Sequence, residues 1–200
     1  MNTYVYELGQ RLYINLTNRC TNDCDFCIRN GNEGIGDAKL WIEREPEAED
    51  ILTQLADFKL DDYKEIVFCG FGEPMLRLEV ILKVAKELKA KRPTMPLRIN
   101  TNGHANLFFG EDVTPKLEGL IDVVSVSLNM PTAKEYEEIC HSRYKEDAFE
   151  GLLDFAAKAQ AHVPKVKLSV VDVIGEEKVR QCQELADERG IPLKVRTFIE

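Results

Sequence analysis

Short apolar runs and longer amphipathic segments alternate along most of the chain. Runs rich in Val, Ile and Phe predict strands, whereas segments with apolar residues every three or four positions predict helices. Pro46 and the acidic residues after it indicate a helix start, with Ile51, Leu55 and Phe58 on one face. The expected strands span residues 4–8, 11–16, 65–69, 97–101, 123–128, 166–173 and 193–198. The expected helices span residues 46–58, 78–88, 114–120, 132–140, 147–161 and 176–189.

The first two strands form a small hairpin around Gly9, and from the second strand onward strands and helices alternate. Strands that are joined by helical crossovers lie parallel, so the pattern predicts an α/β fold with a parallel sheet of six strands. We expect one domain over residues 1–200, with the hairpin at its start and no C-terminal accessory domain. The glycine-rich residues 28–45 are expected to form a long loop, and loops of that length are usually functional or mobile.

Composition excludes some classes of protein. No apolar run approaches the roughly 18 residues of a membrane span, and the polar residues 1–3 do not start a signal peptide, so we expect a cytoplasmic protein without membrane attachment. The net charge of −9 should repel a phosphate backbone, which makes nucleic acid a disfavoured partner. Six cysteines, three bunched and three scattered, suit a reducing compartment better than a disulfide framework.

The three bunched cysteines carry the strongest chemical signal. Cys20, Cys24 and Cys27 have CxxxCxxC spacing directly after the first core strand. Three thiolates can ligate three irons of a [4Fe-4S] cluster and leave the fourth iron open to a small molecule. The alternatives are a zinc site or a redox dithiol, but structural zinc normally takes four ligands and the first histidine is the distant His104.

With Phe26 just before its last cysteine, this run resembles the CxxxCx(aromatic)C signature of the radical S-adenosylmethionine (SAM) superfamily. The resemblance implies a (β/α)6 partial (three-quarter) TIM-like barrel, with a [4Fe-4S] cluster on Cys20, Cys24 and Cys27 and SAM on the open iron. It also implies reductive cleavage of SAM to a 5'-deoxyadenosyl radical that abstracts hydrogen from a substrate. Residues 39–46 and the short chain are similar to the small radical SAM proteins that are associated with TatD-type hydrolases.

Further matches to this family lie where the strands end, which is where ligands gather in parallel sheets. The second parallel strand ends in a GxGEP run, whose acid would meet the amino group of SAM, and the third ends in a TNG run similar to that of glycyl-radical activases. Each run alone is also typical of an ordinary turn. The resemblance implies SAM contacts by Phe26, Gly70, Phe71, Gly72, Glu73, Pro74, Asn100, Asn102, Ser127, Asn129, Val173 and Arg196.

Several classes of function stay open. The resemblance favours an enzyme that acts on an unidentified small molecule and takes its electron from a separate donor such as flavodoxin or ferredoxin, with a functional link to a TatD-type hydrolase. The alternatives are an activating enzyme for a glycyl-radical partner protein and a non-catalytic Fe-S and SAM-binding sensor. Because no C-terminal domain is expected, residues 28–45 or a partner surface would have to cover the open side of the barrel.

Other candidate groups carry weaker signals. His104 is either a substrate-side proton donor or an ordinary turn histidine. Cys69 is expected to pack within its strand rather than line a pocket, and Cys140 and Cys182 are expected in the core. Without a further CxxC pair, a second cluster is not expected.

Overall fold

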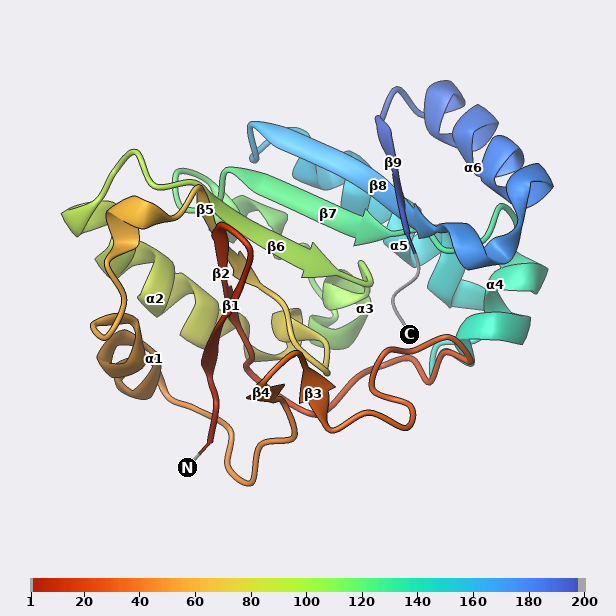
Figure 1. Cartoon of the computed structure of the whole chain (residues 1–200). Coiled ribbons are helices and arrows are strands. Elements are labelled where there is room, and N and C mark those ends of the chain that lie inside the picture. The colour runs from red at the N-terminus through yellow and green to blue at the C-terminus, as the bar shows by residue number, and fades with distance from the viewer. Residues whose placement is uncertain (1, 198–200) are drawn as a thin grey trace.

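The computed structural model describes residues 2–197, which fold around one large sheet. Its seven strands lie in the order β1-β2-β5-β6-β7-β8-β9, so that each strand lies beside the next one in the chain (Figure 1). The strands are β1 (Val5–Leu8), β2 (Arg11–Ile14), β5 (Glu65–Phe68), β6 (Leu97–Thr101), β7 (Val123–Ser127), β8 (Lys165–Val171) and β9 (Leu193–Arg196). Strands β1 and β2 pair antiparallel, and the six from β2 to β9 pair parallel.

This topology confirms the predicted (β/α)6 partial barrel with a hairpin at its start. The helices are α1 (Ala48–Leu55), α2 (Leu78–Lys91), α3 (Ala105–Phe109), α4 (Ala133–Cys140), α5 (Glu146–Ala159) and α6 (Glu176–Glu188). Four 3-10 turns also occur: η1 (Leu60–Asp62), η2 (Pro74–Arg77), η3 (Thr114–Leu117) and η4 (Asp172–Ile174). Of the described helices, none is both long and apolar enough to cross a bilayer.

The hydrophobic core lies between the sheet and the helices. Alternate strand residues such as Leu12, Phe68, Ile99 and Val126 have no exposed surface and pack in one cluster with the helices. The side chains between them point to the opposite face, because successive residues of a strand alternate sides. The helices therefore cover only one face of the sheet (Figure 1). We call the opposite face, which none of the described helices covers, the concave face.

Two local predictions need correction, and one helix was not predicted. Helix α1 begins at Ala48 rather than Pro46, because the Asp50 carboxylate accepts a hydrogen bond from the Glu47 N–H and so caps the start of the helix at Glu47. Residues 28–45 contain a short hairpin, β3 (Gly34–Ile35) with β4 (Ala38–Lys39), which is too short to show hydrophobic alternation. Helix α3 has only five residues, too few for a helical period to show. The predicted last strand reached residue 198, which lies outside the described residues.

Candidate active site

The cysteine loop, residues 20–27, lies beyond the end of β2 and is fastened to the end of α4. The backbone N–H of Asp23 donates to the carbonyl of Cys140 at 3.0 Å, and that of Asp25 donates to the carbonyl of Ile139 at the same distance. These carbonyls belong to the last turn of α4, where they have no partner within the helix. The N–H groups of the loop thus satisfy carbonyl groups at the end of helix α4, and these hydrogen bonds hold the loop in position.

Buried side chains fasten the loop to the end of β6. The Asn102 amide donates to the hydroxyl of Thr21 at 2.7 Å and lies 3.8 Å from the sulfur of Cys20. The Thr21 hydroxyl contacts Nδ1 of His104 at 3.1 Å, and Nε2 of His104 lies 3.1 Å from the Ala148 carbonyl. Because a carbonyl can only accept, the ring proton is assigned to Nε2 and Thr21 donates to Nδ1.

His104 is a structural residue in this network. It is 1% exposed, and burial lowers its pKa to about 4, so the ring is neutral at physiological pH. Both ring nitrogens have protein partners. The structure therefore favours the turn-histidine alternative over a proton donor on the substrate side.

Glu73, in the GxGEP run, is buried with its carboxylate surrounded by protein donors. It accepts hydrogen bonds from the backbone N–H of Met75 at 3.0 Å, the hydroxyl of Thr101 at 2.7 Å and the backbone N–H of Asn102 at 2.7 Å. Burial raises its pKa to about 7 in spite of these donors. The carboxylate joins the ends of β5 and β6, and its contact with the amino group of SAM stays a prediction.

The two glycines of the GxGEP run are required by close packing within the protein. A Cβ atom on Gly70 would lie 2.0 Å from Oδ1 of Asn15, and one on Gly72 would lie 2.3 Å from the carbonyl oxygen of Thr17. Pro74 is buried at the start of η2, and Phe71 packs against Leu40. Gly70 and Gly72 were also expected to let SAM approach the backbone closely, and this contact stays a prediction.

The three loop cysteines are free thiols, each partly exposed. Burial and the nearby Glu73 raise the pKa of Cys20 to about 12, and burial raises that of Cys27. A hydrogen bond with the thiol of Cys140, added to burial, raises the pKa of Cys24 as well. All three are therefore protonated at neutral pH, and binding a metal must release their protons.

The number and type of these donors fit a [4Fe-4S] cluster. In residues 2–197, no three Cys, His, Asp or Glu side chains are grouped so that they could hold a metal ion. Cys24 packs against the core beside Cys140 and also lies near Cys20 and Cys27. The sulfur of Cys140 lies 3.5 Å from the Asn129 amide nitrogen.

The polar residues predicted to bind SAM differ in whether the protein already satisfies them. The amide nitrogen of Asn102 donates a hydrogen bond to the hydroxyl of Thr21, and its carbonyl oxygen accepts one from the backbone N–H of His104. Asn100 and Asn129, in contrast, each carry a buried carbonyl oxygen that has no partner among residues 2–197. Buried polar atoms in folded proteins are normally hydrogen-bonded, so these two oxygens are candidates for ligand contacts.

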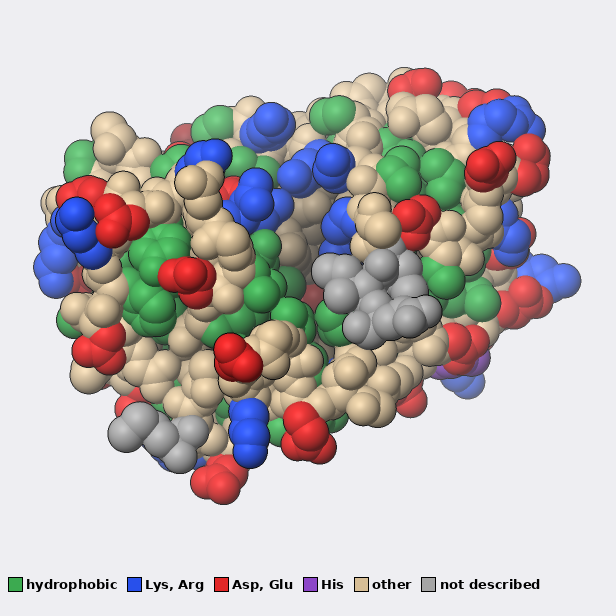
Figure 2. Space-filling view, in the orientation of Figure 1, with side chains coloured by type: hydrophobic (Ala, Val, Ile, Leu, Met, Phe, Trp, Pro, Cys, Tyr) green, Lys and Arg blue, Asp and Glu red, His purple; other side chains and the backbone are tan. Residues whose placement is uncertain are grey.

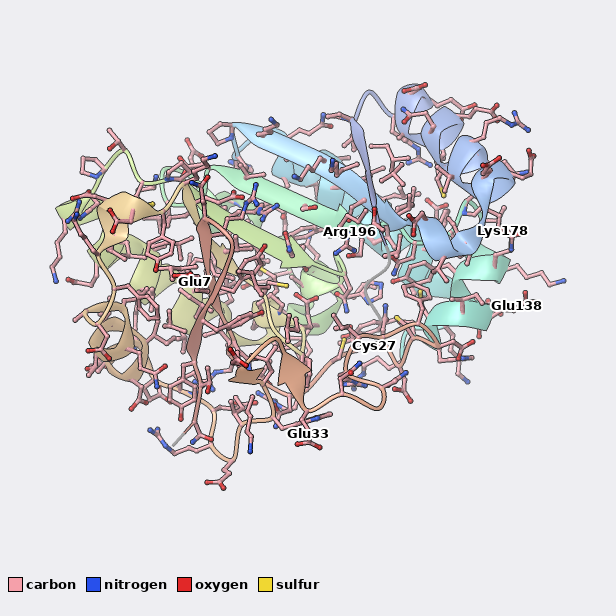
Figure 3. The ribbon with its side chains drawn as sticks, in the orientation of Figure 1. Glu7, Cys27, Glu33, Glu138, Lys178 and Arg196 are labelled. Atoms are coloured by element: carbon pink, nitrogen blue, oxygen red, sulfur yellow. The ribbon has the colours of Figure 1, made fainter. Side chains whose placement is uncertain are left out.

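The remaining predicted contacts are spread around the rim. Ser127 is the last residue of β7, and Asn129 has a left-handed φ of 61°, so the strand alternation that was expected to place both on one face stops between them. Val173 is exposed in η4, and Phe26 is partly exposed in the cysteine loop. Figure 3 shows Arg196 on β9 above the concave face, with Cys27 on the loop across from it. Their contacts with SAM stay predictions.

Sequence reasoning missed the residues that hold the cysteine loop in place. Thr21 and Asn22 are both buried, and the Asn22 amide donates to the hydroxyl of Tyr136 at 2.8 Å. Cys140 was correctly expected in the core, but its contact with Cys24 was not expected. The available signal was the polar pair Thr21 and Asn22 between the first two cysteines of the motif, because both of these polar side chains are buried.

Comparisons with known proteins agree with this site. The sequence model of the Radical SAM superfamily matches residues 14–188. The chain belongs to the radical SAM superfamily. This is a superfamily of enzymes that use a [4Fe-4S] cluster and SAM, as the cysteine motif predicted.

The chain is also similar to individual radical SAM proteins. It is 29% identical over 182 residues to "Probable GTP 3',8-cyclase" of Methanocella arvoryzae, covering 91% of this chain and 54% of that protein. It is 25% identical over 189 residues to "Molybdenum cofactor biosynthesis protein 1" of Drosophila melanogaster, covering 94% of this chain and 31% of that protein. The chain thus spans between about a third and about half the length of these curated relatives.

Among solved structures, Streptococcus suis SuiB bound to S-adenosylmethionine has the same fold. The TM-score is 0.67 at 18% identity, and the match covers 96% of this chain and 40% of SuiB. A radical SAM methyltransferase from Sphaerobacter thermophilus matches with a TM-score of 0.61 at 14% identity, over 96% of this chain and 68% of that one. Both likenesses support the partial-barrel fold.

Proposed function

We propose that this radical SAM protein is a catalyst that generates a 5'-deoxyadenosyl radical and uses it to abstract hydrogen from a small molecule. Cys20, Cys24 and Cys27 would hold three irons of the cluster, and SAM would occupy the fourth. When bound and reduced, such a cluster supplies the electron that cleaves SAM. The observation that carries the proposal is the cysteine loop, which lies at the carboxyl ends of the strands, where a parallel sheet binds its ligands.

The chain's own residues orient the site. Asn102 and Thr21 position Cys20 through their hydrogen bonds, and the last turn of α4 holds the loop backbone. The unpaired carbonyl oxygens of Asn100 and Asn129 would accept hydrogen bonds from SAM hydroxyl or amino groups. Cys24 would release its proton when the cluster binds.

Relatives bear on the choice of substrate. One of them is named a probable GTP 3',8-cyclase, which supports a small-molecule substrate. An activating enzyme for a glycyl-radical protein and a non-catalytic sensor remain as alternatives. The proposal also includes an external electron donor such as flavodoxin or ferredoxin, a functional link to a TatD-type hydrolase, one catalytic domain over residues 1–200 and a cytoplasmic location, where a reducing environment keeps the thiols free.

SAM cleavage tests the proposal directly. The protein is loaded with iron and sulfide without oxygen, given SAM and reduced with dithionite, and 5'-deoxyadenosine is measured by chromatography. We expect 5'-deoxyadenosine to form in the loaded protein but not in a Cys27→Ala control. A loaded and reduced protein whose cluster spectrum does not respond to SAM would instead support the sensor alternative.

Glu73→Ala tests the role predicted for the GxGEP carboxylate. If Glu73 meets the amino group of SAM, its loss should weaken SAM binding about tenfold, since a charge-assisted hydrogen bond contributes about 1.5 to 3 kcal/mol. Binding is measured by equilibrium dialysis at equal iron content. Unchanged SAM affinity in a cluster-loaded variant would limit Glu73 to its structural contacts with Met75, Thr101 and Asn102.

A further inference from the structure

The concave face of the sheet, the face that the helices leave uncovered, has a chemistry of its own. The strand register places Tyr13, Val67, Arg98, Val123 and Lys165 in one row across five strands. Paired residues of neighbouring strands point to the same side, and so do residues two positions apart within a strand. The side chains of the whole concave face can therefore be identified from the register.

This face is strongly cationic in an acidic protein. Glu65 is the only carboxylate that the described strands contribute to it, whereas the chain as a whole has a net charge of −9. Figure 2 shows Lys and Arg side chains gathered around the hollow in the middle of this side of the molecule. The cationic side chains that the strands contribute are Arg11, Arg98, Lys165, Lys167, Lys194 and Arg196.

The single carboxylate leaves most of these cations unpaired. Glu65 accepts from Arg11 at 2.5 Å and from Arg98 at 3.2 Å. Within residues 2–197, Lys167 and Lys194 form no ion pair, and the buried Nε of Arg98 has no hydrogen-bond partner. Cations that repel each other at close range, with a buried donor left free, are costly unless a ligand supplies the missing negative charge.

The cations act on one another across the face. Partial burial lowers the pKa of Lys167, and the positive charges of Arg98, Lys165 and Lys194 lower it further. The strand register supports this, because it places Arg98 and Lys165 in one row of the face, two strands apart, and Lys194 on the strand beside that of Lys167.

SAM does not account for this charge. It carries a sulfonium and an ammonium group against one carboxylate, so it is itself a cation and gains nothing from most of these residues. Arg98 lies four residues before Asn102 along β6, which corresponds to about 13 Å at the rise of a strand. Since Asn102 contacts Cys20, the cations lie deeper in the barrel than the cysteine loop.

We propose that the concave face binds the substrate of this enzyme, and that this substrate is a small anion with at least two negative charges, held by Arg98, Lys167 and Lys194. Phosphate and carboxylate groups share the chemistry that these side chains recognise. The proposal rests on the proposed function, because it places the anion in the same barrel as the cluster and SAM. The reacting carbon would then lie between the anionic groups and the cysteine loop.

Anion binding can be measured without turnover. The cluster-loaded protein with saturating SAM, at about 0.15 M salt to screen weak surface attraction, is titrated in a calorimeter with inorganic tripolyphosphate and, separately, with citrate. The variants are Lys167→Gln and Lys194→Gln, with Lys167→Arg as the variant that keeps the charge. Lys86→Gln is the matched control, because it removes the same charge from an exposed position on α2.

We expect saturable binding of at least one anion to the wild-type protein, weakened about tenfold in each Gln variant. Lys167→Arg and Lys86→Gln should bind within about twofold of wild type. Preference for tripolyphosphate would identify a phosphorylated substrate, and preference for citrate a polycarboxylate. Unfolding curves of all variants ensure that only folded protein is compared.

Two results would overturn the inference: no saturable binding of either anion, or an equal loss in Lys86→Gln and Lys167→Gln. SAM cleavage by the wild-type protein is measured separately. Cleavage without anion binding would reject this inference and leave the proposed function intact. Anion binding without cleavage would reject the proposed function while the cationic site remains.

Discussion

The residues that hold the cysteine loop and those of the concave face are both polar, but the described protein supplies hydrogen-bond partners mainly to the first. Asn102 and Asn100 show the difference, because they lie two residues apart at the end of β6. Asn102 has partners for both ends of its amide group, whereas the carbonyl oxygen of Asn100 has none. The comparison teaches that motif residues divide into those that build the site and those that are left free for ligands.

The largest expected effect is the loss of the cluster when a cysteine of the loop is replaced. Cys20→Ala, Cys24→Ala or Cys27→Ala should each abolish loading, because two thiolates cannot hold three irons. Cys182→Ala removes a buried thiol from α6 and should retain about four irons per chain. Iron and sulfide analysis after anaerobic loading measures the difference. Full iron content in a variant without all three cysteines would refute the assignment.

The next effect is on the pH dependence of stability, to which His104 and Glu73 contribute in opposite directions. The pKa of His104 is lowered in the folded protein to about 4, so its contribution to stability is present above pH 6.5 and is lost as pH falls toward 4. The pKa of Glu73 is raised to about 7, so its contribution is present below pH 4.5 and is lost as pH rises through 7. Each contribution is up to about 3 kcal/mol, and the two have opposite signs.

Single variants should therefore change the pH dependence in opposite directions. On acidification from pH 7 to 4.5, His104→Gln should gain stability relative to wild type, and Glu73→Gln should lose it. Urea unfolding of cluster-free protein at several pH values gives the free energies. Parallel curves for the two variants would show that these groups do not titrate as their burial implies.

A smaller effect compares the two asparagines directly. Asn102→Ala removes the donor to the Thr21 hydroxyl and leaves the backbone N–H of His104 without its partner, and it should lower the free energy of unfolding by about 2 to 3 kcal/mol. Asn100→Ala removes an oxygen that has no partner and should cost less than about 1 kcal/mol. Denaturant unfolding measures both. Equal losses would mean that the free oxygen of Asn100 does not mark a ligand position.

The smallest effect concerns the cover of the concave face. Leu40 is fully buried and the ring of Trp41 packs edge-on against Phe71 with 5.2 Å between ring centres, so the end of the 28–45 segment is already anchored. We expect binding of tripolyphosphate to slow hydrogen exchange in residues 29–38, compared with SAM alone. Equally fast exchange in both states would indicate that a partner surface provides the cover.

Strands and helices could be predicted because they follow from local periodicity. The run at 97–101 alternates as β6 does, the run at 65–69 is apolar as β5 is, and all six parallel strands were predicted within a few residues. The cysteine spacing likewise determined the family before any contact was known. The β3–β4 hairpin and α3 were missed because two to five residues carry too little pattern.

The sequence by itself determined the cysteine triplet, the order of strands and helices, and hence the barrel and its chemistry. Only the tertiary structure decided that Cys24 meets Cys140, that His104 is buried and neutral, and that Glu73 joins two strand ends. It also decided that cations from β2, β6, β8 and β9 share one face. The physical reason is distance along the chain: spacing and periodicity act over a few residues, whereas these contacts depend on the register of strands that the sequence separates widely.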